Sequence, residues 1–150
     1  GNNTVYGQDG DDKIYTGSGA DILEGGKGND IYHFSGDFGR DIIYNKDIVN
    51  LQPNEQHDRI EFSDFLLKDI ILQRNNDNLY LISKKQQSNT VIIYHYFENN
   101  GNTAYRIDEI RFADGSTLDY DAVNRLVQQP TGNPPRANLV QDRYAADAAR

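Results

Sequence analysis

A nine-residue repeat that runs to Tyr44 limits the folds open to this chain more than any other feature. Each copy carries glycine at its fourth position, Asp or Asn at its sixth and a large apolar residue at its eighth. Four complete copies begin at Gly7, Thr16, Gly25 and Gly36, and the chain opens inside an earlier copy that supplies Gly1, Asn3 and Val5. Because three residue classes stay in phase, the pattern predicts repeated units that stack on one another. We expect further sequence to precede an opening of this kind.

Each position of the repeat has a physical reason. The Gly-x-x-Gly-x-Asp part makes a turn whose backbone reaches positive φ, which glycine adopts cheaply. Three residues then run extended, with one apolar side chain facing inward. A three-residue strand cannot bury that side chain alone, so the copies must stack into a solenoid with a shared apolar centre. With two copies in each coil, every second copy lies on the same edge.

Stacking of this kind places the sixth-position carboxylates of Asp12, Asp21, Asp30 and Asp41 in two columns. Carboxylates in one column lie about 4.8 Å apart, the spacing of neighbouring strands. Like charges this close oppose folding unless a cation neutralises them. A hard dication such as calcium, which takes six to eight oxygen ligands from carboxylates and backbone carbonyls, suits the arrangement.

Composition excludes several other classes of protein. The 23 acidic residues outnumber the 15 basic ones and give a formal charge of -8, which argues against nucleic acid as a partner. The chain has no cysteine, so disulfides, thiolate zinc sites and thiol nucleophiles are excluded. No apolar run reaches the roughly 18 residues that a membrane helix needs, and no N-terminal signal peptide is recognised.

The repeat resembles the calcium-binding nonapeptide of the repeats-in-toxin (RTX, haemolysin-type) family, G-G-x-G-x-D-x-U-x. Segments 58–62, 78–82 and 110–116 resemble the capping region that follows the repeats in toxins and adhesins of this family. The resemblance implies an all-β fold in three parts. These are a parallel β-roll over 1–44, an antiparallel β capping region with a short helix over 45–128, and a disordered tail or secretion-signal remnant over 129–150.

The resemblance also implies calcium sites between alternate turns of the roll. The first site would use the carboxylates of Asp12 and Asp30, with Gly28 in the same turn and the carbonyls of Gln8, Gly10, Gly25 and Lys27. The second would use the carboxylates of Asp21 and Asp41, with the carbonyls of Gly17, Gly19, Gly36 and Phe38. Asp9, Asp11 and Asp37 are expected to be solvated turn residues.

Three departures from the family pattern bear on these sites. Asn3 replaces the Asp of the first copy, so a site between Asn3 and Asp21 is expected to be weak or empty. Thr16 replaces a first-position glycine. Phe34 and Ser35 form a two-residue insertion, from which we expect a shift of the fourth turn. Both of the latter departures affect the second site.

The rest of the chain reads as short strands and one helix. Residues 45–57 are polar and are expected to form a loop. Alternating β-branched and aromatic residues predict strands over 59–62, 70–73, 79–82, 90–97, 105–112 and 117–118. The sequence Asn75-Asn76-Asp77 predicts a hairpin, and the spacing of Val123, Leu126 and Val127 predicts one or two helical turns.

A catalytic site is not apparent in the sequence. His33, His57 and His95 are scattered and lack the His-Glu-x-x-His spacing of a zinc enzyme. The expected function is therefore that of a non-enzymatic calcium-binding module.

The family resemblance implies that this module belongs to a larger bacterial toxin or adhesin, secreted to the extracellular space by a type I system. Calcium ions, the type I secretion machinery and, through the parent protein, a host-cell surface or glycan are the expected partners. Folding would follow calcium binding outside the cell. Two alternatives stay open. One is an adhesion or polysaccharide-binding module in which the roll is a scaffold and Tyr94 and Tyr96 contact sugar. The other is the C-terminal tail of a secreted lipase or protease.

Overall fold

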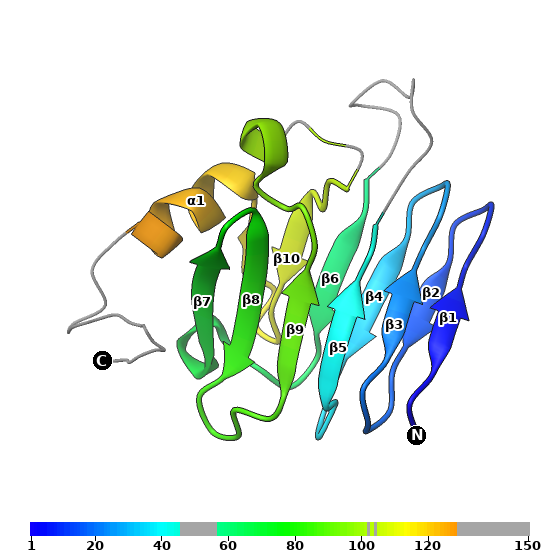
Figure 1. Ribbon diagram of the computed structural model, residues 1–150. Helices are drawn as coiled ribbons and strands as arrows, with labels where there is room; N and C mark the ends of the chain where they lie inside the picture. The colour runs from blue at the N-terminus through cyan, green and yellow to red at the C-terminus, as the bar shows by residue number, and fades with distance from the viewer. Residues whose placement is uncertain (46–56, 102, 104, 129–150) are drawn as a thin grey trace. The chain divides into compact units, whose positions relative to one another are not determined.

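The computed structural model of the 150-residue chain describes residues 1–45, 57–101, 103 and 105–128. The predicted tail over 129–150, and all of the predicted loop except Asn45 and His57, lie outside these described residues. Residues Gly1–Tyr120 form one compact unit, and Asp121 begins a second. The first unit holds two β-sheets, and the short strands alternate between them along the chain as far as β7 (Ile70–Asn75) (Figure 1).

Both sheets combine strands from the repeats with strands from the later part of the chain. In order across the first sheet the strands are β1 (Thr4–Tyr6), β3 (Ile22–Glu24), β5 (Arg40–Ile43), β9 (Thr90–Ile93), β8 (Asn78–Ser83) and β7 (Ile70–Asn75). In order across the second they are β11 (Thr117–Leu118), β10 (Glu109–Arg111), β6 (Arg59–Phe62), β4 (Ile31–Phe34) and β2 (Lys13–Tyr15). Short 3₁₀ turns are η1 (Leu67–Asp69) and η2 (Glu98–Gly101).

The strands of the repeats pair in the way that the nine-residue period predicts. Thr4 lies opposite Ile22 and Ile22 lies opposite Ile42, while Lys13 lies opposite Ile31 on the other sheet. All three pairings are parallel and join every second copy of the repeat. The predicted parallel β-roll, with two copies in each coil, is confirmed.

Parallel pairing continues beyond the last repeat. Strand β6 pairs in parallel with β4, β10 with β6, and β9 with β5. Only the pairs β7–β8, β8–β9 and β10–β11 are antiparallel among the described strands. The region expected to be an antiparallel cap is therefore mixed, and three of its strands extend the two faces of the roll.

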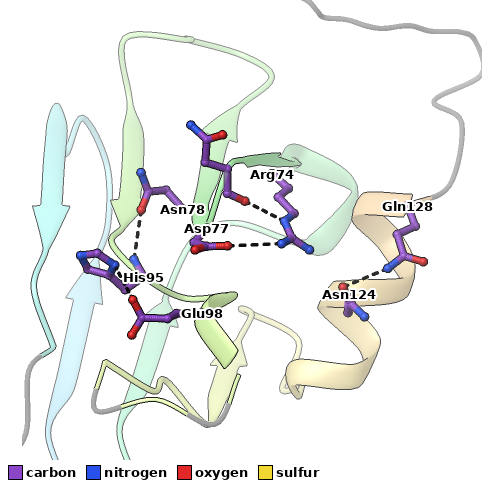
Figure 2. Close-up of polar contacts among 8 residues, drawn as sticks. Arg74, Asp77, Asn78, His95, Glu98, Asn124 and Gln128 are labelled. Atoms are coloured by element: carbon purple, nitrogen blue, oxygen red, sulfur yellow. Dashed lines mark hydrogen bonds and ion pairs between the residues drawn. The ribbon is translucent and has the colours of Figure 1, made fainter. Parts of the chain in front are cut away.

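The predicted strand over 90–97 is too long, because β9 ends at Ile93. His95 takes a left-handed φ of 60°, and its backbone N–H donates to Asn78 Oδ1 at 3.0 Å, so the chain turns here (Figure 2). The His95 Nδ1 atom also lies 3.2 Å from Glu98 Oε2. A side chain from the neighbouring hairpin thus ends a run whose composition is typical of a longer strand.

The predicted strand over 105–112 is likewise shortened to β10. The backbone N–H of Arg106 donates to Thr103 O at 3.2 Å, which is a turn rather than a ladder contact. The strands over 59–62 and 117–118 have the predicted bounds. The predicted hairpin is present between β7 and β8, where Arg74 Nη2 lies 3.4 Å from Asp77 Oδ1 (Figure 2).

Helix α1 (Tyr120–Gln128) confirms the predicted helical turns. It carries an Asn124–Gln128 side-chain hydrogen bond of 3.1 Å along one face (Figure 2). Within the described residues, no helix has the length and apolar character needed to cross a membrane.

The interior of the roll is built from the eighth position of the repeat. The side chains of these residues are buried in four of the five copies: Ile14, Leu23, Tyr32 and Ile43. The inserted residue Phe34 extends β4 by one residue and is wholly buried, with its ring centroid 5.4 Å from that of Phe38. The insertion is therefore absorbed by a longer strand and an aromatic core contact.

Candidate metal sites

One edge of the roll carries a column of four aspartates: Asp12, Asp30, Asp58 and Asp108. Each stands directly before a strand of the second sheet, in the order β2, β4, β6 and β10. The backbone N–H of each donates to the carboxylate of the next, at 3.1, 2.8 and 3.1 Å along the column. The predicted ligands Asp12 and Asp30 are therefore brought together.

Sequence reasoning missed that Asp58 and Asp108 continue this column. Neither follows a glycine-rich turn, so neither belongs to a recognisable copy of the repeat. The available signal was the Asp-x-apolar pattern of Asp58-Arg59-Ile60 and Asp108-Glu109-Ile110, which matches Asp12-Lys13-Ile14.

The opposite edge carries Asn3, Asp21 and Asp41. Asn3 and Asp21 stand directly before β1 and β3, and Asp41 is the second residue of β5. The N–H of Asn3 donates to Asp21 Oδ1 at 2.8 Å, and that of Asp21 donates to Asp41 Oδ1 at 3.1 Å. Asp21 and Asp41 are 3% and 0% exposed. The second predicted pair is also brought together, and the insertion at Phe34 does not displace Asp41 from its column.

Several predicted carbonyl ligands face the next turn on the same edge. A methyl group at Gly26 would collide with the carbonyl oxygen of Gln8, one at Gly28 with that of Gly10, and one at Gly39 with that of Gly19. These glycines, all at positive φ, let successive turns approach until the carbonyls lie between them.

Gly7 marks where a carboxylate and a carbonyl converge. A methyl group there would lie 2.6 Å from both Asp12 Oδ2 and Gly25 O. Two predicted ligands of the first site, from alternate turns, are thus aimed at the same small space. Only a residue without a side chain leaves that space open.

The other predicted residues are less closely placed. A methyl group at Gly17 or Gly36 would meet open space, so no described neighbour crowds these turns. The Gly36 N–H donates to Asp64 Oδ2 at 2.9 Å, the side chain of Lys27 is exposed, and that of Phe38 is buried in the core. Asp9, Asp11 and Asp37 are exposed turn residues.

The columns have the electrostatics expected of a cation site. Asp12 Oδ2 and Asp41 Oδ2 are buried, and no described residue hydrogen-bonds to either atom. Burial, together with the negative charge of Asp21, raises the pKa of Asp41 to about 7, even though the backbone N–H of Asp21 and the Thr16 hydroxyl act to lower it. Buried carboxylate oxygens without donors are costly, and a bound cation would satisfy them.

The chemistry of the donors fits calcium. In the part of the chain that the structure describes, three or more His, Asp or Glu side chains do not gather into one metal-binding group. A cation between two turns would therefore need backbone carbonyls beside the paired carboxylates. An all-oxygen set of this kind suits calcium rather than zinc.

Thr16 is a further candidate ligand at the second site. Its Oγ1 atom is buried, has no hydrogen-bond partner among the described residues, and influences the Asp41 carboxylate. On sequence alone Thr16 only departs from the glycine pattern. The structure instead places its hydroxyl oxygen close enough to the Asp41 carboxylate to affect the pKa of that group.

Thr16→Val should therefore weaken calcium binding at the second site by several-fold, since it removes an oxygen donor at nearly constant volume. Thr16→Ser, which keeps the hydroxyl, should stay close to the wild type. Thr4→Val, on an exposed position of β1, is the matched control. Calorimetric calcium titration of the four proteins checks this, and equal affinities for the Val and Ser variants would contradict it.

Comparisons with known proteins agree with this geometry. The family model of the RTX calcium-binding nonapeptide repeat (4 copies) matches residues 1–32, and that of the haemolysin-type calcium binding protein related domain matches residues 78–122. A curated relative, the iron-regulated protein FrpA of Neisseria meningitidis serogroup C, is 42% identical over 110 residues, which are 73% of this chain and 10% of that protein.

The chain thus spans about a tenth of the length of this relative. The first match covers the copies of the repeat that carry Asp12, Asp21 and Asp30, and the second covers strands β8 to β11 with Asp108. Repeats of this type bind Ca²⁺. The chain belongs to the RTX, haemolysin-type calcium-binding family.

Proposed function

We propose that this chain is a calcium-dependent folding module of a larger secreted bacterial protein. The observation that carries the proposal is the pair of carboxylate columns, in which Asp12 Oδ2 and Asp41 Oδ2 are buried without a hydrogen-bond donor among the described residues. The first ion would be held by Asp12 and Asp30 with the carbonyls of Gln8, Gly10 and Gly25. The second would be held by Asp21 and Asp41 with the carbonyl of Gly19 and the hydroxyl of Thr16.

The buried carboxylates make folding depend on the ion. Without a cation, Asp21 and Asp41 place like charges in a desolvated position and raise the free energy of the folded chain. Bound calcium supplies the positive charge and the oxygen coordination that the columns lack. Because no preformed site exists in the unfolded chain, the free energy of binding becomes free energy of folding.

This dependence suits a protein that crosses a membrane unfolded and folds outside. Extracellular calcium-binding modules have dissociation constants on the order of 10⁻⁴–10⁻³ M, which cytosolic calcium does not reach. We therefore assign the parent protein to type I export, as a toxin or adhesin in the extracellular space. The module itself has no catalytic role in this proposal.

The polysaccharide-binding alternative is weakened by the position of its tyrosines. Tyr96 is only 2% exposed and stacks on Tyr120 at 5.5 Å, so its ring is not available to a sugar. Tyr94 packs edge-to-face on Tyr44 at 4.5 Å. Both residues support the fold of the region after the repeats.

The test is a calcium titration of the chain followed by circular dichroism, starting in chelator. We expect the β signal to rise with calcium, with a midpoint on the order of 10⁻⁴–10⁻³ M, and magnesium at the same concentration to be much less effective. A spectrum in chelator that already equals the calcium-loaded spectrum would overturn the folding switch.

A further inference from the structure

Tyr32 stands at an inward, apolar position of the repeat but carries a polar group into the core. Its side chain is wholly buried, between Leu23 and Ile43 in the series of eighth-position residues. The hydroxyl accepts the backbone N–H of Gly25 at 2.8 Å and donates to Asn45 Oδ1 at 2.6 Å. A buried hydroxyl with two partners is a specific structural element, because leaving either partner unsatisfied costs free energy.

The first of these contacts fixes a peptide next to the first calcium site. The peptide that joins Glu24 to Gly25 is held at both ends: Glu24 O accepts the N–H of Gly7 at 2.7 Å, and the Gly25 N–H donates to Tyr32 Oη. The following carbonyl, that of Gly25, is the one that converges with Asp12 Oδ2 beside Gly7. A methyl group at Gly25 would also meet both Tyr32 Oη and Asp30 Oδ2, so all three groups are adjacent.

The second contact leads away from the repeats. The Nδ2 atom of Asn45, a fully buried residue, donates to Asp58 Oδ2 at 2.6 Å and to Arg106 O at 2.7 Å. Asp58 is the residue that also accepts the N–H of Asp30, at 2.8 Å. Arg106 Nε in turn donates to Asp108 Oδ1 at 2.8 Å.

The aspartate column therefore changes character along its length. Between Asp12 and Asp30 it presents a buried carboxylate oxygen that a cation would satisfy. From Asp58 onward, an amide and a guanidinium supply the donors instead. A continuous set of hydrogen bonds, from Gly25 through Tyr32 and Asn45 to Asp58, joins the two parts.

We propose that Tyr32 and Asn45 are positioning residues for the first calcium site, which orient the Gly25 turn and couple that site to strands β6 and β10. This inference rests on the proposed function. Without the Tyr32 hydroxyl, the Gly25 N–H and Asn45 Oδ1 would both lose a buried partner, and the turn would rearrange to recover one. Loss of a residue that holds a metal ligand in place typically weakens metal affinity by about ten- to a hundredfold.

The test uses Tyr32→Phe, which removes the hydroxyl and keeps the ring, with Tyr80→Phe on the partly exposed face of β8 as control. Each substitution is placed in two backgrounds: Asp41→Asn, which leaves the first site, and Asp12→Asn, which leaves the second. Calorimetric calcium titration should show affinity for the first site falling about tenfold with Tyr32→Phe, and affinity for the second site unchanged.

The other possible results of these titrations each count for or against the proposal. Equal losses at both sites would show a general structural role for Tyr32 and overturn the proposal, as would no loss at either site. If a background variant does not fold, the wild type and Tyr32→Phe are compared directly, and one of two binding steps should shift. A wild-type chain that binds no calcium would instead refute the proposed function.

Discussion

Asp30→Asn should weaken calcium-dependent folding by on the order of a hundredfold, because calcium affinity follows the number of charged ligands in the site. Asn keeps the oxygen that accepts the Asp12 N–H at 3.1 Å, so the ladder is preserved while one negative charge is removed. The expected measurement is a calcium midpoint, read by circular dichroism, far above that of the wild type.

The same substitution should have the opposite effect without calcium. Asp30 is fully buried between Asp12 and Asp58 in its column, and a neutral amide there reduces the repulsion between carboxylates. In chelator, the β signal of Asp30→Asn should equal or exceed that of the wild type. This reversal of sign separates a metal ligand from a residue that only supports the fold, whose loss would weaken both states.

Asp11→Asn is the matched control for Asp30→Asn. Asp11 lies in a turn on the same edge, and its Oδ1 also accepts an N–H from the next turn, that of Asn29 at 2.8 Å, but the residue is exposed. Its substitution should leave the calcium midpoint within about twofold, since an exposed charge is screened by solvent. If both variants shift the midpoint equally, the column does not form a specific site.

The repeat predicted the roll because its period fixes which residues meet. Glycine at the fourth position and Asp at the sixth recur every nine residues, so strand pairing, burial of Leu23 and alignment of Asp12 with Asp30 all follow from local spacing. Even the insertion of Phe34 and Ser35 leaves this alignment intact, because Phe34 extends β4 by one residue and Asp41 keeps its place beside Asp21.

The rest depends on contacts that no local pattern specifies. Asp58 and Asp108 join the column across sequence separations of 28 and 50 residues, without the glycines that identify a repeat. Strand β9 ends at Ile93 because the side chain of Asn78 captures the next turn, which the β-branched composition of the segment does not reveal. Thr16 similarly becomes a candidate ligand only once Asp41 is seen beside it.

Gly39→Ala should disrupt the second calcium site and destabilise the calcium-loaded fold by about 2–5 kcal/mol, from the positive φ and from a collision. Gly39 takes a φ of 79°, and a methyl group would run into the carbonyl of Gly19, a predicted ligand. The chain cannot yield easily on the other side, since Gly39 N donates to Asn89 Oδ1 and Gly39 O accepts from Thr90 N, both at 2.9 Å.

Gly10→Ala separates the two causes of the Gly39→Ala loss. Gly10 also has a positive φ, 109°, but a methyl group there would face open space, so this variant has the backbone strain without the collision. The substitution is expected to lower the free energy of unfolding by about 1–2 kcal/mol.

Denaturant unfolding in saturating calcium measures the free energy of unfolding of both variants. The difference between the two losses is the cost of the collision between successive turns. Equal losses would mean that the second site does not depend on the close approach of these turns. A larger loss for Gly39→Ala, together with a higher calcium midpoint for the second site, would support the carbonyl of Gly19 as a calcium ligand whose position depends on the missing side chain of Gly39.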